Sequence, residues 1–201
     1  MNKRIALQLI AGSIAAAALG MGLAACSETK QSFNAVDITG ADYAKDFSLK
    51  DADGKVRTMA DFKGKAVVLF FGYAQCPDVC PTTMTEMAQV KQQLGKDGDK
   101  LQVLFVTVDP ARDTPEVMKA YMGAFDPNFV ALIPTPEELV ATAKDFKVYY
   151  KKVDGKTPTS YSMDHSAASF IYDTQGRLRL YARYGAGVPS MVSDLKTLLG
   201  S

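Results

Sequence analysis

The chain contains no tryptophan and only one histidine, His165, in 201 residues. Any chemistry that needs an imidazole must therefore use that residue. Neither sign of charge dominates, because 23 basic and 22 acidic residues leave a net charge of +1. This excludes the polybasic face that would hold nucleic acid electrostatically. Apolar residues are not scarce: they make up 47% of the chain, which excludes a disordered protein.

Charged residues are absent from the N-terminal stretch 5–25, which follows Lys3 and Arg4. A short basic start followed by an apolar run predicts a signal peptide over residues 1–25. The run ends in Leu-Ala-Ala-Cys at residues 23–26, which resembles a bacterial lipobox. By that resemblance, Cys26 carries a lipid and becomes the first mature residue. An uncleaved transmembrane anchor is the alternative, and both place the domain outside the cytoplasm.

The rest of the chain divides into a short tether and one domain. Residues 26–44 are mostly polar with scattered apolar side chains, which is typical of a membrane-proximal tether that begins to dock on its domain. Residues 45–201 have the length of one ordinary domain. If Cys26 carries a lipid, only Cys76 and Cys80 remain as thiols, in a compartment where disulfides form readily. They then pair with each other or bind something else.

The order of strands and helices predicts an α/β fold. Strands are indicated by apolar runs and turn dipeptides, and helices by Thr-Pro starts and helical spacing. We expect hairpins at 47–58 and 148–163, strands at 65–73, 101–108, 169–172 and 177–184, and helices at 81–94, 115–125, 136–146 and 188–199. The first strand–helix–strand unit requires parallel pairing and the last two strands antiparallel pairing. This is the order of a thioredoxin-like fold: a mixed central sheet flanked by helices, here with an inserted hairpin.

The segment Cys-Pro-Asp-Val-Cys-Pro at 76–81 places two thiols between the first buried strand and its helix. Free amide groups and the helix dipole at such a position stabilise thiolate, the form that binds metal or attacks disulfides. The spacing brings both sulfurs close enough to chelate one ion or to close a disulfide. A purely structural disulfide is the simpler alternative, but it would close too small a loop to stabilise much.

His165 precedes the strand expected from Ser169, in a loop that faces the dithiol in thioredoxin-like folds. That loop commonly carries a cis-proline, and the corresponding residue here is Ala167. The usual platform for a substrate disulfide is therefore missing, while an imidazole two residues earlier can reach the two sulfurs. Asp164 either orients the imidazole ring or caps a turn, and the sequence leaves both options open.

Two thiolates and one imidazole are soft enough for Cu(I) and still suit Cu(II). A structural zinc site would need a fourth protein ligand, and the sequence offers no evident one. Ligand softness therefore favours copper at Cys76, Cys80 and His165.

Three segments resemble the signature blocks of the Sco/SenC family of copper-binding proteins. They are Phe-Gly-Tyr-Ala-Gln-Cys-Pro-Asp-Val-Cys-Pro at 71–81, Val-Asp-Pro-Ala-Arg-Asp-Thr-Pro at 108–115 and Asp-His-Ser at 164–166. The resemblance runs from about residue 33 to residue 199. It implies a membrane-tethered copper chaperone, not an enzyme, that delivers copper to the copper-centre subunit of cytochrome c oxidase. It also implies Cys76, Cys80 and His165 as ligands and Asp109 as a supporting or weak axial group, although Asp109 also suits a turn at a strand end.

The same resemblance implies a periplasm-facing lipoprotein of a bacterial cell envelope, working as a monomer. Ser27 after the lipid-bearing Cys26 favours the outer membrane under one sorting rule. The implied oxidase partner lies in the inner membrane, and we favour that membrane. Another periplasmic copper carrier or a thiol reductant would be a further partner.

A thiol-disulfide oxidoreductase that reduces the cysteines of the oxidase copper site is the alternative function, and it would use Cys76 and Cys80 as a redox pair. A two-residue spacer, a preceding tryptophan and a cis-proline would mark such an enzyme. This chain has three residues between its cysteines, no tryptophan, and Ala167. A peroxide-consuming enzyme is less favoured, because its Thr-x-x-Cys arrangement is missing.

Overall fold

The computed structural model describes residues 32–157 and 160–200. The strands are β1 Val36–Asp37, β2 Leu49–Lys50, β3 Val56–Arg57, β4 Ala66–Gly72, β5 Leu101–Thr107, β6 Val130–Leu132, β7 Tyr150–Asp154, β8 Tyr161–His165, β9 Ser169–Tyr172 and β10 Leu178–Ala182. The helices are α2 Val79–Gln93, α3 Pro115–Gly123, α4 Pro136–Asp145 and α5 Val188–Leu199, with 3₁₀ turns at Met59–Phe62 and Gly95–Lys100. No helix among these residues has the length and apolar character needed to cross a membrane.

A six-stranded mixed sheet forms the centre of the domain, in the order β1-β10-β9-β4-β5-β6. Strands β4, β5 and β6 are parallel, whereas β9 pairs antiparallel with both β4 and β10. Every residue of β4 and β5 is buried, as their continuous apolar sequences require. The predicted mixed sheet flanked by helices is confirmed.

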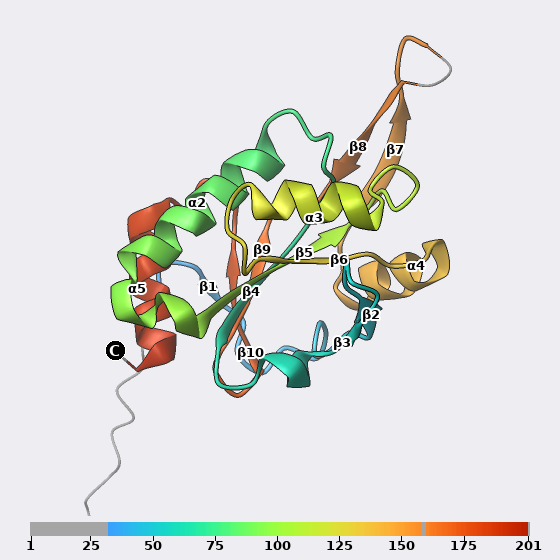
Figure 1. Cartoon of the computed structure of the whole chain (residues 1–201). Coiled ribbons are helices and arrows are strands. Elements are labelled where there is room, and N and C mark those ends of the chain that lie inside the picture. The colour runs from blue at the N-terminus through green and yellow to red at the C-terminus, as the bar shows by residue number, and fades with distance from the viewer. Residues whose placement is uncertain (1–31, 158–159, 201) are drawn as a thin grey trace, which may run out of the picture. The chain divides into compact units, whose positions relative to one another are not determined.

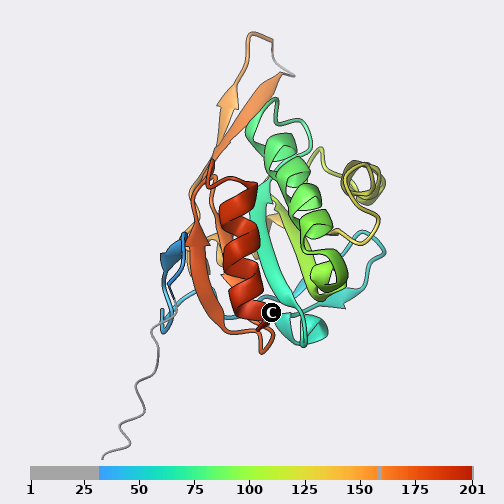
Figure 2. The ribbon, with the colours of Figure 1, turned by 90° about the vertical axis from the view of Figure 1, so that its left-hand side faces the viewer.

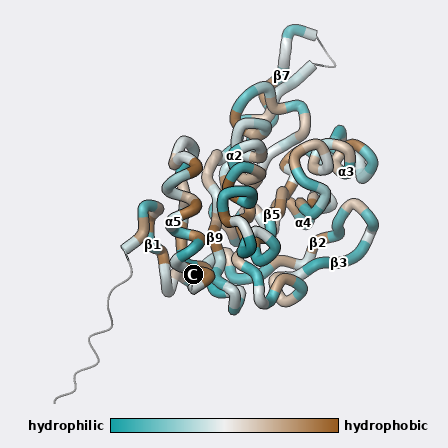
Figure 3. Tube along the Cα trace, turned by 60° about the vertical axis from the view of Figure 1, so that its left-hand side comes forward, coloured by the Kyte–Doolittle hydropathy of each residue, from teal (hydrophilic) through white to brown (hydrophobic). Residues whose placement is uncertain are grey.

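Helices cover both faces of this sheet. Helices α2 and α5 lie side by side on one face (Figures 1 and 2). The rings of Phe70 and Phe71, neighbours in β4, point to opposite faces: Phe70 contacts Phe105, and Phe71 contacts Phe146 at the end of α4. Figure 3 shows the result, with hydrophobic residues along the central strands and hydrophilic ones on the outer turns of the helices. The loop that carries Cys76 begins where β4 leaves this core.

The β7–β8 hairpin is a separate two-stranded sheet that projects from the domain (Figure 1). Its register pairs Tyr150 with His165 and Asp154 with Tyr161. The predicted hairpin around Asp154 and Gly155 is therefore confirmed, but β8 runs as far as His165. The expectation that His165 lies in a loop is wrong, because cross-strand pairing with Tyr150 extends the strand to that residue.

Residues 33–44, which the sequence assigns to the tether, belong to the folded domain as the structure describes it. Asp194 of α5 is buried and accepts hydrogen bonds from the backbone N–H groups of Asn34 and Ala35, both at 2.8 Å. The Asn34 side-chain amide donates to the same carboxylate at 2.9 Å. Strand β1 then pairs with β10. The predicted signal peptide, Cys26 and the first residues of the tether lie outside the described residues.

Candidate metal centre

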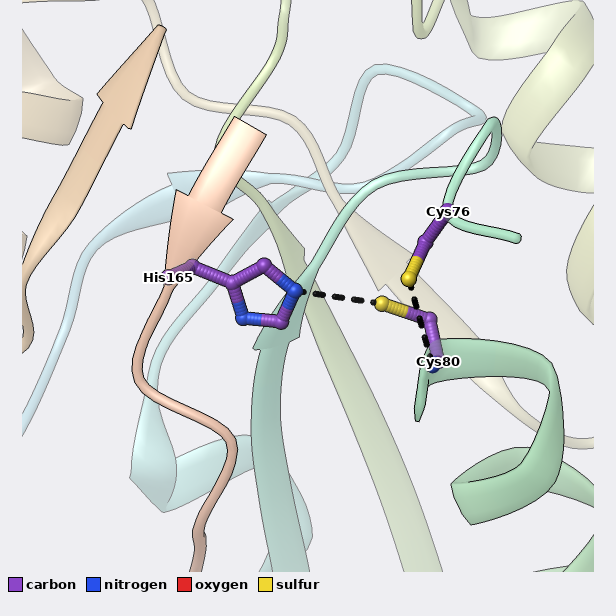
Figure 4. Close-up of side chains that lie close together, drawn as sticks. All are labelled: Cys76, Cys80 and His165. Atoms are coloured by element: carbon purple, nitrogen blue, oxygen red, sulfur yellow. Dashed lines mark hydrogen bonds between the residues drawn. The ribbon is translucent and has the colours of Figure 1, made fainter. Parts of the chain in front are cut away.

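The three predicted ligands come from two segments of the chain that meet at one end of β4. Cys76 lies in the loop between β4 and α2, and Cys80 lies in the first turn of α2. His165 ends β8 and points its ring toward the two sulfurs (Figure 4). Cys80 is buried, whereas Cys76 and His165 are half-buried.

The ligand atoms of these residues are close enough to share one ion. Both cysteines are free thiols. The three ligand atoms lie within 4.8 Å of one another, and His165 Nε2 is 3.4 Å from Cys80 Sγ. Two atoms that bind the same transition-metal ion at roughly 2.0–2.3 Å each lie at most about 4.6 Å apart, so little movement is needed. Two thiols and one imidazole suit a soft ion such as copper.

A backbone carbonyl orients the His165 ring. Nδ1 donates a hydrogen bond to the carbonyl oxygen of Ser166 at 3.0 Å, which leaves Nε2 to face Cys80 as an acceptor. The rings of Phe70 and Tyr73 stand edge to face with the imidazole, each at 5.9 Å between centroids. The side chain of Asp164 is exposed, and its role stays a prediction.

Burial controls the charge states of two ligands. It lowers the pKa of His165, so the imidazole stays neutral and able to bind metal at lower pH than an exposed histidine. It also raises the pKa of the Cys80 thiol well above its usual value. In the metal-free protein the Cys80 thiol is therefore favoured over the thiolate that the sequence leads us to expect. The loss of water around its sulfur outweighs the backbone hydrogen bond from Tyr73 that favours the thiolate, and a bound cation would have to reverse this effect.

Gly72 makes room for the Cys80 sulfur. A Cβ atom built on this glycine would lie 2.7 Å from Cys80 Sγ and 2.7 Å from Cζ of Phe105. Real Cβ atoms do not approach other atoms so closely. The last residue of β4 therefore needs to be glycine for the buried thiol to occupy its present place.

Asp109 is near the centre but is bound to other partners. Its carboxylate is paired with the guanidinium of Arg112, and its Oδ1 accepts a 2.8 Å hydrogen bond from the hydroxyl of Tyr161. Among the described residues, the group able to hold a metal ion contains Cys76, Cys80 and His165 and not Asp109. A supporting role for Asp109 stays a prediction, and its contacts point to one exerted through Arg112 and Tyr161.

Asp113 supports the start of the dithiol loop. Its buried Oδ2 accepts hydrogen bonds from the Thr107 hydroxyl at 2.5 Å and from the Ala74 backbone N–H at 3.1 Å. Burial raises the pKa of this carboxyl. Sequence reasoning assigned no role to Asp113, Arg112, Tyr73 or Tyr161. A signal existed for the first three, because they lie inside the segments 71–81 and 108–115 that carry the family resemblance.

Comparisons with known proteins agree with this geometry. A family model described as SCO1/SenC matches residues 36–200. The chain is 34% identical over 133 residues to an SCO2-like protein of Rickettsia felis and 38% identical over 133 residues to the mitochondrial SCO2 homolog of Bos taurus. These stretches cover 66% and 65% of this chain, but only 65% and 50% of the two relatives.

Solved structures resemble the domain over nearly their whole length. ScoI of Bradyrhizobium japonicum with copper bound has a TM-score of 0.69 at 40% identity, covering 76% of this chain and 97% of that one. Apo Sco1 of Thermus thermophilus has a TM-score of 0.74 at 35% identity, covering 85% and 99%. Yeast Sco1 with copper bound has a TM-score of 0.70 at 30% identity, covering 78% and 87%.

Proposed function

The chain belongs to the SCO1/SenC family, and on that premise we propose that it is a copper chaperone. It binds one copper ion through Cys76, Cys80 and His165 and delivers it to the dinuclear copper centre of cytochrome c oxidase. The observation that carries the proposal is the cluster itself, in which all three ligand atoms lie within 4.8 Å of one another. Relatives solved with copper bound, from Bradyrhizobium japonicum and yeast, support the choice of metal.

The unequal burial of the two thiols suggests how the cargo leaves. Cys80 is buried and Cys76 is half-buried, so a ligand of the receiving protein reaches the metal from the Cys76 side. Stepwise exchange of thiolate ligands moves a soft ion from one protein to the other without releasing it to water. Loading displaces the thiol protons, and unloading returns them.

The ligand set accommodates both oxidation states. Cu(I) is satisfied by two thiolates, whereas Cu(II) gains from an additional nitrogen ligand. His165 is poised for that role, because its Nε2 already faces Cys80 and its Nδ1 proton is held by Ser166. The imidazole is therefore expected to matter most for Cu(II).

The anchoring and location of the protein are also part of the proposal. Cys26 carries a lipid that holds a periplasm-facing monomer on the envelope of a bacterial cell, with the inner membrane favoured because the proposed receiver lies there. Support comes from the Leu-Ala-Ala-Cys sequence at 23–26. A Cys26→Ala precursor should lack lipid and fail to stay with the membrane fraction. Normal lipidation of that variant would refute the assignment.

A reductase remains the second candidate, because one observation favours it. The N–H of Cys80 donates to Cys76 Sγ at 3.5 Å, so the more accessible of the two sulfurs has a backbone donor beside it, as the attacking thiol of a dithiol reductase would need. Against it, no peptide bond among the described residues is cis, and Ala167 replaces the expected cis-proline. Both functions use the same thiols, so the histidine must discriminate between them.

The discriminating experiment compares His165→Ala with the wild type and with Ser162→Ala, an exposed position on the same strand. His165→Ala should keep its fold and its dithiol–disulfide cycle but lose at least the roughly 10-fold to 100-fold in Cu(II) affinity that removing a partner of a metal ligand costs, with a smaller loss for Cu(I). Ser162→Ala should match the wild type. Unchanged Cu(II) affinity and absorption spectrum in His165→Ala would reject the ligand assignment and favour the reductase.

A further inference from the structure

The hairpin that carries His165 has few backbone connections to the domain. Strands β7 and β8 pair with each other and with no strand of the central sheet. A two-stranded hairpin is at best marginally stable in water without further packing. The position of the imidazole relative to the thiols must therefore be fixed largely by side chains that join the hairpin to the domain.

Arg112 makes contacts with three separate segments at once. Its Nε is paired with the carboxylate of Asp109, in the loop after β5. Its Nη1 donates to Oε1 of Gln75 at 3.0 Å and to the carbonyl oxygen of Tyr161 at 2.9 Å. Gln75 precedes Cys76, and Tyr161 begins β8. One guanidinium thus joins the thiol-bearing loop to the histidine-bearing strand.

The Tyr161 side chain reinforces this junction. The guanidinium carbon of Arg112 lies 3.5 Å from the centroid of the Tyr161 ring, and Lys152 Nζ lies 4.3 Å from it. The hydroxyl of Tyr161 donates to Asp109 Oδ1 at 2.8 Å. We call Asp109, Arg112 and Tyr161 the Arg112 clamp.

The ion pair within the Arg112 clamp is shielded from water. The Arg112 and Asp109 side chains are only 18% and 4% exposed, so screening does not reduce their pairing to the small worth of a surface ion pair. Tyr73 connects the clamp to the metal centre: its ring centroid is 5.8 Å from the guanidinium carbon and 5.9 Å from the His165 centroid. A planar, forked guanidinium suits this combination of stacking and several directed hydrogen bonds, which lysine cannot reproduce.

We propose that Arg112 is a positioning residue that holds the His165 strand against the Cys76 loop and thereby sets how readily the imidazole joins the two thiols around copper. This inference rests on the proposed copper function. Arg112 itself does not touch the metal. Because Cu(I) is satisfied by the dithiol, loosening the hairpin weakens Cu(II) binding selectively and shifts the protein toward Cu(I).

The test uses the full domain with Arg112→Lys and Arg112→Ala. Tyr161→Phe removes only the hydroxyl bond to Asp109. The matched control is Arg57→Lys, which disturbs a similar partly buried pair between Arg57 Nε and Asp51 Oδ2 at 2.6 Å, in the separate β2–β3 hairpin. Three quantities are measured: Cu(II) affinity and its electron paramagnetic resonance spectrum, Cu(I) affinity, and amide hydrogen exchange of residues 161–165 without metal.

Both Arg112 variants should lose about 10-fold to 100-fold in Cu(II) affinity and show an altered nitrogen contribution in the spectrum, with a change of roughly threefold or less for Cu(I). Exchange at 161–165 should quicken by about tenfold or more while β4 stays protected. Tyr161→Phe should show a smaller effect, and Arg57→Lys none at this site.

Wild-type Cu(II) affinity, spectrum and hairpin exchange in both Arg112 variants would overturn the inference. Equal losses for Cu(I) and Cu(II), with faster exchange in β4 as well, would show general destabilisation and also overturn it. If the wild type itself fails to bind copper through His165, the proposed function fails. The metal-free exchange measurement then still decides whether Arg112 holds the hairpin.

Discussion

At the scale of single residues, the candidate metal centre depends on Gly72, which has no side chain. Gly72 ends β4 at the point where the Cys80 sulfur packs against the strand. A methyl group at this position would meet Cys80 Sγ, Phe105 Cζ and Phe70 Cε1 at 2.7, 2.7 and 2.9 Å. Phe105 and Phe70 are themselves fully buried and cannot move aside easily.

Gly72→Ala should therefore lower the free energy of unfolding by about 1–3 kcal/mol, as overpacked cores do. It should also weaken copper binding by about tenfold or more, because the least obstructed response is to displace the Cys80 thiol. Chemical denaturation and copper titration measure the two effects. Gly123→Ala is the control, since nothing lies within 4 Å of its Cβ, and it should stabilise the domain by about 0.4–1 kcal/mol. Normal copper affinity in Gly72→Ala would show that the strand moves instead.

The pKa of His165 gives the metal-free domain a specific acid sensitivity. Burial lowers this pKa in the folded state, whereas the unfolded chain binds a proton near pH 6.5. As pH falls below about 6.5, His165 binds a proton in the unfolded state but stays neutral in the folded state, so the free energy of unfolding decreases. The slope from this single group is at most about 1.4 kcal/mol per pH unit.

Subtracting the stability curve of His165→Ala from that of the wild type isolates this effect below about pH 6.5. The buried Asp113 carboxyl, whose raised pKa acts in the opposite direction, is present in both proteins and cancels. A flat difference curve would show that the folded domain protonates His165 as readily as the unfolded chain does.

The residue scale also shows the limits of sequence reasoning. Cys76, Cys80 and His165 were identified because few side chain types bind soft metals and the chain has few of them. The group that orients His165 is the Ser166 carbonyl, and every residue has a carbonyl, so no sequence pattern marks it. The burial of Cys80 is equally invisible, because it results from how α2 packs on the end of β4 and how β8 places His165 beside the sulfur.

At the scale of elements, the carboxylate of Asp194 holds the start of the N-terminal segment on the domain, and β1 then pairs with β10. Asp194 accepts hydrogen bonds from Asn34 and Ala35, and Ile38 N–H then donates at 2.9 Å to the carbonyl of Arg179 in β10. The edge strand β1 is separated from β4 by β10 and β9. This attachment is therefore independent of the metal centre.

Asp194→Ala should lower the free energy of unfolding by about 2–3 kcal/mol, because a buried charged acceptor of several bonds is lost. Amide exchange at Val36 and Ile38 should quicken, while copper affinity stays at the wild-type value. Asp194→Asn keeps one carbonyl acceptor and should lose less. A change in copper affinity would contradict the separation of the two regions.

Elements with strong local signals were predicted well. The Thr114 and Thr135 side chains accept hydrogen bonds from Val117 and Glu138 N–H groups, as their Thr-Pro sequences indicated. The short strands β1 and β6 were not predicted, because two or three residues cannot show a period. They form because neighbouring strands offer free backbone groups, such as those of Tyr181 and Leu104.

At the scale of the whole molecule, copper binding and folding should be linked. The folded domain assembles ligands from both halves of the chain, and the unfolded chain does not. If copper binds as proposed, free metal at about 100 times the dissociation constant should stabilise the reduced domain by about 2.7 kcal/mol. A chelator should remove this gain.

The oxidised domain is the control for the copper stabilisation expected of the reduced domain. A disulfide between Cys76 and Cys80 removes both thiolates, so copper should not raise the unfolding temperature of the oxidised domain. Cys80→Ser should likewise lose most of the effect. Equal copper stabilisation of the reduced and oxidised forms would contradict the dithiol as the binding group.

The ligands also differ in when they become available as the chain folds. Cys76 and Cys80 are four residues apart, but His165 is separated from Cys80 by 85 positions. Closing the longer loop costs roughly 3 kcal/mol more chain entropy. Closing this loop must await the pairing of β9 with β4, because β9 follows the strand that ends at His165. If the chain binds copper as proposed, it presents a dithiol before it presents a three-ligand site. Copper met during that interval would be held by sulfur alone, and the arrival of the imidazole would report that the C-terminal half has folded.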